Sequence, residues 1–222
     1  MKQLFIGLAT EGTTDVRFLE SIVTRAFEDI VFSECEQEIE IYTQVLKVEK
    51  QGLSFPEYVK KAAKEGFEQY GIMTLAIHTD ADRETYQERY NDKIVPAYEM
   101  LDQVEDDDIC RILTPIIPVR MMEAWMLADT SLFIEELATD KTKTELHIDR
   151  NPEIIADPKQ TIENAISIAT EHLPKRRQRL TIADMYAAIG TKIELFSLRK
   201  LPSFRKFEDE IRDSLRKLHY LR

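Results

Sequence analysis

Two carboxylates follow a short apolar run near the middle of the chain. Residues 72–77 are apolar apart from one threonine, which is typical of a strand buried on both faces of a parallel sheet. Asp80 and Asp82 come where this strand would end, and open α/β sheets bind ligands at the carboxyl ends of their strands. Residues two apart in an extended segment point the same way, so both carboxylates are candidates to bind one Mg²⁺ or Mn²⁺ ion. The alternative is a polar turn that caps the next helix.

A second acidic group follows the first predicted strand, at residues 2–9. Glu11 would stand at the carboxyl end of that strand, and Gly12 permits a tight turn into a helix. Asp15 would lie in the first turn of this helix, where a negative charge suits the helix macrodipole. Packing gives no reason for a glutamate at position 11, which makes Glu11 a further candidate for chemistry.

A third acidic residue, Glu123, lies just after the fourth predicted strand. The segment 120–129 (RMMEAWMLAD) is almost wholly apolar apart from Arg120 and Glu123. A glutamate buried there is costly unless it is paired or bound to a metal. Two alternatives stay open: an ion pair with Arg120 at helical spacing, or a position on a solvated helix face.

Strands and helices alternate through the first 120 residues. We expect strands at 2–9, 39–48, 72–77 and 112–119, separated by helices that end near residue 30 and that cover 55–69 and 84–104. This α/β alternation predicts a Rossmann-type, mainly parallel four-stranded sheet flanked by helices. Pro115 and Pro118 mark the fourth strand as an edge or irregular strand. Because the carboxyl ends of parallel strands share one edge, the acidic groups can converge there, where they repel one another unless a divalent cation neutralises them.

From residue 130 onward the pattern is helical. We therefore predict an α/β domain at 1–128 and a helical C-terminal extension at 129–222 that packs on it. One of the predicted helices of the extension can end at Gly190. Trp125 and Tyr186 are most simply core residues rather than platforms on which bases stack.

The charge is unevenly distributed along the chain. The net charge of −11 argues against a general nucleic-acid coat protein. Residues 174–222, however, carry 13 Lys/Arg and 6 Asp/Glu, including the basic run 175–179 (KRRQR). This basic tail could bind phosphates or dock on the acidic remainder, and a solvated or internally neutralised face is the commoner outcome for such a run.

Several features indicate a cytoplasmic protein with no membrane association. Cys35 and Cys110 show no C-x-x-C spacing, which indicates reduced thiols. The first residues show no signal-peptide pattern, and the longest apolar runs are far short of a membrane span.

Two motifs in this order resemble the Toprim domain. They are Glu11-Gly12-Thr13-Thr14-Asp15 after a first strand and Asp80-Ala81-Asp82 after a third. Type IA and II topoisomerases, bacterial primases and the OLD (overcoming-lysogenization-defect) nucleases share this domain, and the resemblance covers about residues 1–120. Residues 120–129 and 201–212 (LPSFRKFEDEIR) are also similar to segments of a compact Toprim-like family of unknown function. Its members are bacterial and archaeal, are often encoded beside an ATPase and are suspected in defence against phage.

The resemblance implies metal-dependent phosphodiester chemistry on DNA or RNA. Glu11 would match the Toprim glutamate, a metal ligand or general acid/base, and Asp80 and Asp82 would match the metal-binding aspartates. Asp15 would match the second acidic position of the nuclease branch, whereas Glu123 would be an extra ligand with no secure counterpart. The chain has no room for the tyrosine domain of a topoisomerase and lacks the accessory parts of a primase, so a nuclease remains.

The implied mechanism is two-metal hydrolysis, with Mg²⁺ or Mn²⁺ held by the catalytic carboxylates. Arg83, Arg120 or the basic tail would hold the phosphate backbone. Two alternatives stay open. One is a non-catalytic Toprim-fold sensor or regulatory partner of an ATPase, and the other is Mg²⁺ chemistry on a phosphate-containing small molecule.

Overall fold

The computed structural model describes residues 2–222 except 84, 106 and 173–179. In this described part, four parallel strands form one sheet in the order β2-β1-β3-β4, with β1 at Lys2–Ala9, β2 at Ile39–Val45, β3 at Thr74–His78 and β4 at Leu113–Ile116. The predicted α/β fold with a parallel four-stranded sheet is thereby confirmed. Pro115 lies on an edge strand, as its missing N–H predicts. The basic run 175–179 lies outside the described residues.

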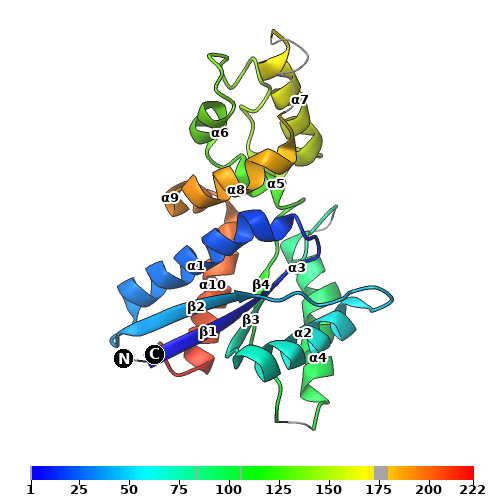
Figure 1. The fold of residues 1–222 in the computed structure, drawn as a ribbon, viewed down its shortest axis with the longest axis vertical. Helices are drawn as coiled ribbons and strands as arrows, with labels where there is room; N and C mark the ends of the chain where they lie inside the picture. The colour runs from blue at the N-terminus through cyan, green and yellow to red at the C-terminus, as the bar shows by residue number, and fades with distance from the viewer. Residues whose placement is uncertain (1, 84, 106, 173–179) are drawn as a thin grey trace.

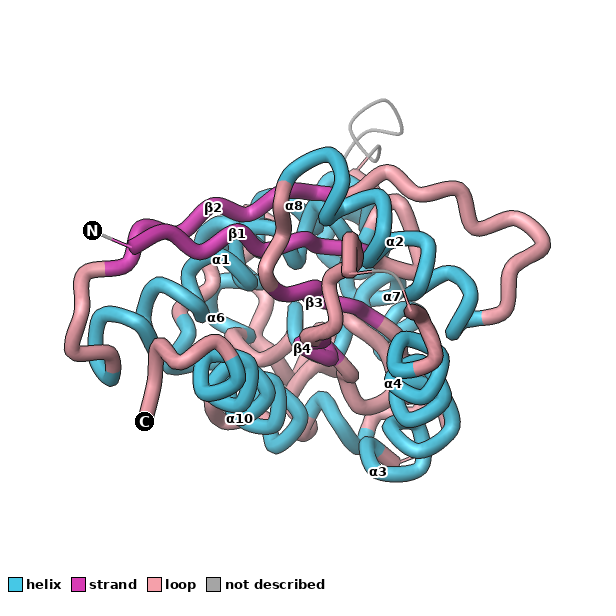
Figure 2. The backbone as a smooth tube through the Cα atoms, turned by 90° about the horizontal axis from the view of Figure 1, so that it is seen from below, coloured by secondary structure: helices cyan, strands magenta, loops and turns pink. Residues whose placement is uncertain are grey.

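Helices cover both faces of the sheet (Figures 1 and 2). On one face lie α1 (Asp15–Glu34) and α10 (Pro202–Lys217), and on the other lie α2 (Phe55–Tyr70) and α4 (Val95–Asp102). Every residue of β3 is therefore buried, which explains why its central residues 75–77 are apolar without alternation.

The predicted helix at 84–104 is interrupted by a π-helical turn. It is divided into α3 (Tyr86–Arg89), η1 (Tyr90–Ile94) and α4. Pro96 lies at the start of α4 and has no N–H to donate to the preceding turn, so the hydrogen-bond register widens there. The N–H of Val95 accordingly bonds to the carbonyl of Tyr90.

The remaining helices form the upper end of the molecule in Figure 1. They are α5 (Glu123–Met126), α6 (Thr130–Glu136), η2 (Pro152–Ile154), α7 (Pro158–Thr170), α8 (Ile182–Lys192) and α9 (Leu195–Leu198). One buried cluster joins them to α1 and β1. Trp125 is a core residue as predicted, because its indole N–H donates to Ser203 Oγ at 2.8 Å and its ring meets Phe204 edge-on.

The last helix of the predicted extension packs directly on the sheet. Ser214 Oγ on α10 lies 2.7 Å from Thr114 Oγ1 on β4, and both hydroxyls are buried. The extension therefore supplies part of the layer that covers the α/β sheet. The boundary at residue 128 stays a prediction.

Gly190 does not end its helix, contrary to the sequence prediction. It lies inside α8, where that helix crosses the backbone of α1. A Cβ atom at this position would be 2.5 Å from the carbonyl oxygen of Phe18. Glycine is required here because two helix backbones approach closely, which a local pattern cannot show.

We predict that Gly190→Ala destabilises the protein, although alanine normally stabilises a helix interior by about 0.5–1 kcal/mol relative to glycine. Overpacking against α1 should lower the free energy of unfolding by about 1–3 kcal/mol in urea titrations. Thr191→Ala, at an exposed position of the same helix, is the matched control. A Gly190→Ala protein as stable as the parent would contradict the close approach.

Candidate functional site

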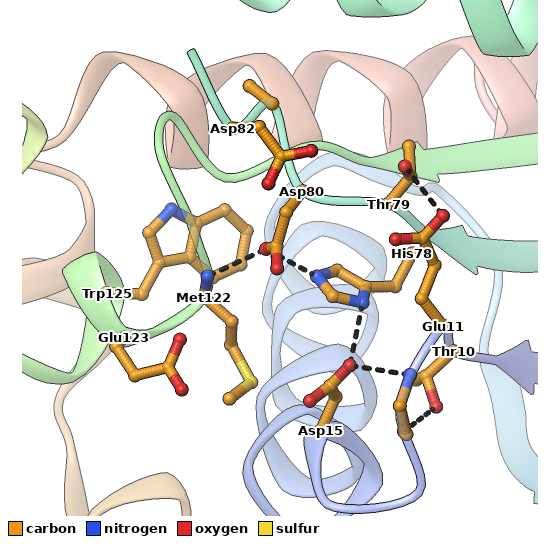
Figure 3. Close-up of polar contacts among 12 residues, drawn as sticks. Thr10, Glu11, Asp15, His78, Thr79, Asp80, Asp82, Met122, Glu123 and Trp125 are labelled. Atoms are coloured by element: carbon orange, nitrogen blue, oxygen red, sulfur yellow. Dashed lines mark hydrogen bonds and ion pairs between the residues drawn. The ribbon is translucent and has the colours of Figure 1, made fainter. Parts of the chain in front are cut away.

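The predicted acidic residues lie at the carboxyl edge of the sheet. Glu11 follows β1, Asp80 follows the neighbouring strand β3, and Glu123 begins α5 after β4. Figure 3 shows the carboxylates of Glu11, Asp15 and Asp80 arranged around the imidazole of His78.

His78, the last residue of β3, is fully buried between two carboxylates. Its Nε2 lies 3.2 Å from Asp80 Oδ1, and its Nδ1 lies 3.3 Å from Asp15 Oδ2. The second contact has the distance of an ion pair without the angles of a good hydrogen bond. Burial lowers the pKa of His78, but the charges of Asp80 and Asp15 outweigh it and raise the pKa to about 10. A protonated imidazole thus supplies positive charge among the carboxylates.

Asp15 closes the turn between β1 and α1. Its Oδ2 accepts a hydrogen bond from the backbone N–H of Gly12 at 2.9 Å. Burial raises the pKa of Asp15, but the contacts with His78 and this N–H more than offset it and hold the pKa below its usual value. The side chain thereby fixes the start of α1 against the end of β3.

Asp80 and Asp82 do not point the same way. Asp80 Oδ1 accepts from the backbone N–H of Met122 at 2.8 Å as well as contacting His78. Asp82 has a φ of 54°, so the expected extended segment is wrong, and its carboxylate pairs with Arg89 on α3 at 2.7 Å. The ligand role of Asp82 stays a prediction, although its contact with α3 ties the turn to the next helix.

Glu11 bridges the ends of β1 and β3. Its Oε1 accepts from the buried Thr79 hydroxyl at 3.1 Å. Its main-chain carbonyl accepts from Lys50 Nζ at 3.4 Å. The carboxylate is therefore held toward the strand that carries Asp80.

Glu123 is buried and bonded to a residue from the helical part of the chain. The Tyr186 hydroxyl donates to Glu123 Oε1 at 2.6 Å. Burial raises the pKa of Glu123, the hydrogen bond from Tyr186 opposes this, and the charges of Asp80 and Asp15 add to the rise. Neither sequence alternative, a pair with Arg120 or a solvated face, describes this residue. Sequence reasoning assigned Tyr186 to the core alone and missed its contact with the acidic edge.

The two predicted phosphate-binding arginines flank the Asp82 turn. Arg83 is exposed, and Arg120 is half-buried with a φ of 69°. The N–H of Asp82 donates to the carbonyl of Arg120 at 2.7 Å, which joins the turns after β3 and β4. Neither guanidinium makes a hydrogen bond or ion pair with a described residue. Their phosphate-binding role stays a prediction.

The residue types at this edge fit a hard cation, but their side chains do not already form a complete metal-binding site. Among the described residues, no three His, Cys, Asp or Glu side chains lie close enough to hold a metal ion as they stand. His78 lies between Asp15 and Asp80, and Arg89 engages Asp82. Glu11 and Asp80 each use one carboxylate oxygen for anchoring, whereas Glu11 Oε2 and Asp80 Oδ2 accept no hydrogen bond from the described part of the chain.

The fold and this edge define an α/β protein with an acidic site at the carboxyl ends of a parallel sheet. The chain belongs to a family described as Domain of unknown function (DUF4276), whose model matches residues 10–212. The match includes both the acidic edge and the helix that carries Tyr186. No curated protein and no solved structure matches this chain. No helix in the described ranges is long and apolar enough to cross a membrane.

The raised pKa of His78 predicts a pH dependence of stability. The stabilisation from protonated His78 is fully present below its unfolded pKa of about 6.5 and is lost as the pH rises through about 10. In metal-free buffer, we therefore expect the free energy of unfolding to fall across this window.

The His78→Gln variant should lack that fall, and near pH 6 it should be less stable than the parent by about 3 kcal/mol, because a buried ion pair is broken. Urea unfolding at several pH values measures both effects. His172→Gln, at an exposed histidine, is the control. An unchanged pH profile in His78→Gln would contradict the charged state of this residue.

A second prediction concerns the bond between Tyr186 and Glu123. Tyr186→Phe removes the donor to a buried carboxylate and should cost about 1–3 kcal/mol of unfolding free energy. The same change should cost much less in a Glu123→Leu background, where the carboxylate is absent. Denaturant unfolding of the two single variants and the double variant measures the coupling. Equal costs in both backgrounds would rule the pairing out.

Proposed function

We propose that this protein is a Mg²⁺- or Mn²⁺-dependent phosphodiesterase of the Toprim type that acts as a nuclease on DNA or RNA. The observation that carries the proposal is the pair Glu11 and Asp80 on the ends of adjacent parallel strands. Each is anchored through one oxygen, and the other oxygen accepts no hydrogen bond from a described residue. Anchored carboxylates with a free oxygen suit the binding of a hard cation.

Glu11 and Asp80 would hold the cation, with Asp15 and Glu123 beside them. When bound, such a cation supplies Lewis-acid activation of a phosphate ester and of a water molecule. The chain itself orients the carboxylates through Thr79, His78 and the N–H of Met122. Arg83 and Arg120 would contact the nucleic-acid backbone on the same edge.

The resemblance to the Toprim domain supports this proposal through the order of the motifs. Glu11 and Asp15 follow β1, and Asp80 and Asp82 follow β3, as the resemblance requires. An ATPase partner and a role in defence against phage are part of the same proposal, since both come from the resemblance.

A non-catalytic role beside an ATPase is the second candidate. The observation that favours it is His78, whose imidazole contacts both Asp15 and Asp80 and can itself offset part of their negative charge. In that case the acidic edge holds α1, β3 and the turn after β4 together, and no bond is cleaved.

Cleavage assays separate the two candidates. Purified protein with single-stranded and duplex DNA and RNA should show cleavage that needs Mn²⁺ or Mg²⁺ and that EDTA abolishes. Glu11→Gln and Asp80→Asn should each reduce the rate by about 100-fold or more. Glu99→Gln and Asp102→Asn, exposed carboxylates on α4, are the matched controls and should leave it unchanged.

Cleavage that survives the double substitution Glu11→Gln/Asp80→Asn would refute the proposed site. A complete lack of cleavage with either metal, together with tight binding to an ATPase, would favour the non-catalytic role.

A further inference from the structure

A cavity opens beside Glu11, on the side away from Asp80. It lies at the carboxyl ends of β1 and β2 and has a volume of about 610 Å³, within the range of small-molecule pockets. In sheet order, the cavity, Glu11, Asp80 and the turn before Glu123 follow one another along the same edge. A ligand in this cavity would therefore lie next to the proposed site.

Half-buried valines line the cavity from three separate segments. Val16 comes from α1, Val45 from the end of β2, and Val48 from the loop that follows β2. The phenol of Tyr58 on α2 also lines it, but its hydroxyl donates to the Thr10 carbonyl at 3.0 Å within the protein. These walls offer apolar contact and few hydrogen bonds, which suits a flat ring more than a polar group.

Two lysines provide positive charge at the same cavity. Lys50 Nζ donates to the Glu11 carbonyl and lies 5.8 Å from the centroid of the Tyr58 ring, so the ammonium group is held near the acidic edge. Lys47 is exposed beside it. Neither ammonium forms an ion pair with a carboxylate of the described residues.

Two carboxylates, those of Glu11 and Glu49, also belong to the lining. The Glu11 side chain, however, is turned toward Thr79 on the β3 side. Glu49 is exposed, and its carbonyl accepts from Lys61 Nζ at 3.3 Å, a lysine that is also paired with Glu65 at 3.8 Å. An anion at Lys47 and Lys50 is therefore compatible with the local charge.

We propose that this cavity receives one unstacked nucleotide of a single-stranded nucleic acid, with its base against the valines and its phosphates at Lys47 and Lys50. The inference rests on the proposed function, because it names the substrate class of the same site. A base can enter a cavity only when it has left its stack, and a paired duplex resists this. The substrate is accordingly a single strand or an unpaired strand end, with the next phosphodiester toward Glu11 and Asp80.

Fluorescence anisotropy tests the assignment by comparing the binding of a labelled oligothymidylate with that of a labelled duplex of equal length. The full chain is used, and EDTA is present so that no strand is cut. The parent should bind the single strand more tightly than the duplex by about tenfold. Lys47→Met/Lys50→Met should weaken single-strand binding by about tenfold and reduce the salt dependence by about 1.4 in the log–log slope, the value for two lost phosphate contacts. Both lysines are exposed, so the fold should persist.

Lys159→Met, an exposed lysine on α7, removes one charge away from the cavity and should change neither quantity. Val48→Trp fills the cavity without altering charge and should weaken single-strand binding while leaving the salt slope intact. Equal binding of duplex and single strand, or an unchanged affinity and salt slope in the lysine variant, would overturn the inference.

The cleavage assay distinguishes failure of the cavity assignment from failure of the proposed function. Metal-dependent cleavage with no effect of the lysine or valine substitutions would refute the cavity assignment alone. Lysine-dependent binding of single strands without any cleavage would support the cavity and refute the phosphodiesterase.

Discussion

Several carboxylates can share the edge of this sheet because a buried histidine lies among them. Asp15 and Asp80 approach opposite nitrogens of His78, whose charged form their own charges favour over the cost of burial. The same contacts join three parts of the chain. Asp15 belongs to the start of α1, His78 ends β3, and Asp80 reaches the backbone of Met122 after β4. One electrostatic network therefore sets the relative positions of the segments that carry the candidate site.

A second constraint on the fold is that both faces of the parallel sheet must be covered by other parts of the chain. The last helix covers β4 through the Thr114 and Ser214 hydroxyls, and Ser203 near its start accepts from the indole of Trp125. Of the helices between β4 and α10, α8 and α9 lie against α1, and α8 brings the Tyr186 hydroxyl to Glu123. The C-terminal half of the chain thus contributes both to the covering of the sheet and to the polar contacts of its acidic edge.

Local patterns predicted the strands and the places of Glu11 and Asp80, because a continuous apolar run followed by a polar turn is a property of neighbouring residues. The direction of the Asp82 side chain was not predictable in this way, since it depends on a positive φ and on Arg89 in the next helix. Tyr186 meets Glu123 across 63 positions of the sequence, a contact that no local period encodes. His78 did give a signal, as an ionisable residue at the end of an otherwise apolar strand, but its two partners come from different elements.

The histidine also limits how much positive charge the site can accept. Counted formally, the carboxylates of Glu11, Asp15 and Asp80 contribute three negative charges, and a protonated His78 beside Asp15 and Asp80 offsets one of them. Glu123 stands apart from this group, because its Oε1 is bonded to the Tyr186 hydroxyl and burial raises its pKa. The remaining two charges match one divalent cation, so a second cation would need further negative charge, such as that of a substrate phosphate. If the proposed chemistry uses two metal ions, the charge balance therefore favours binding of the second ion together with the nucleic acid.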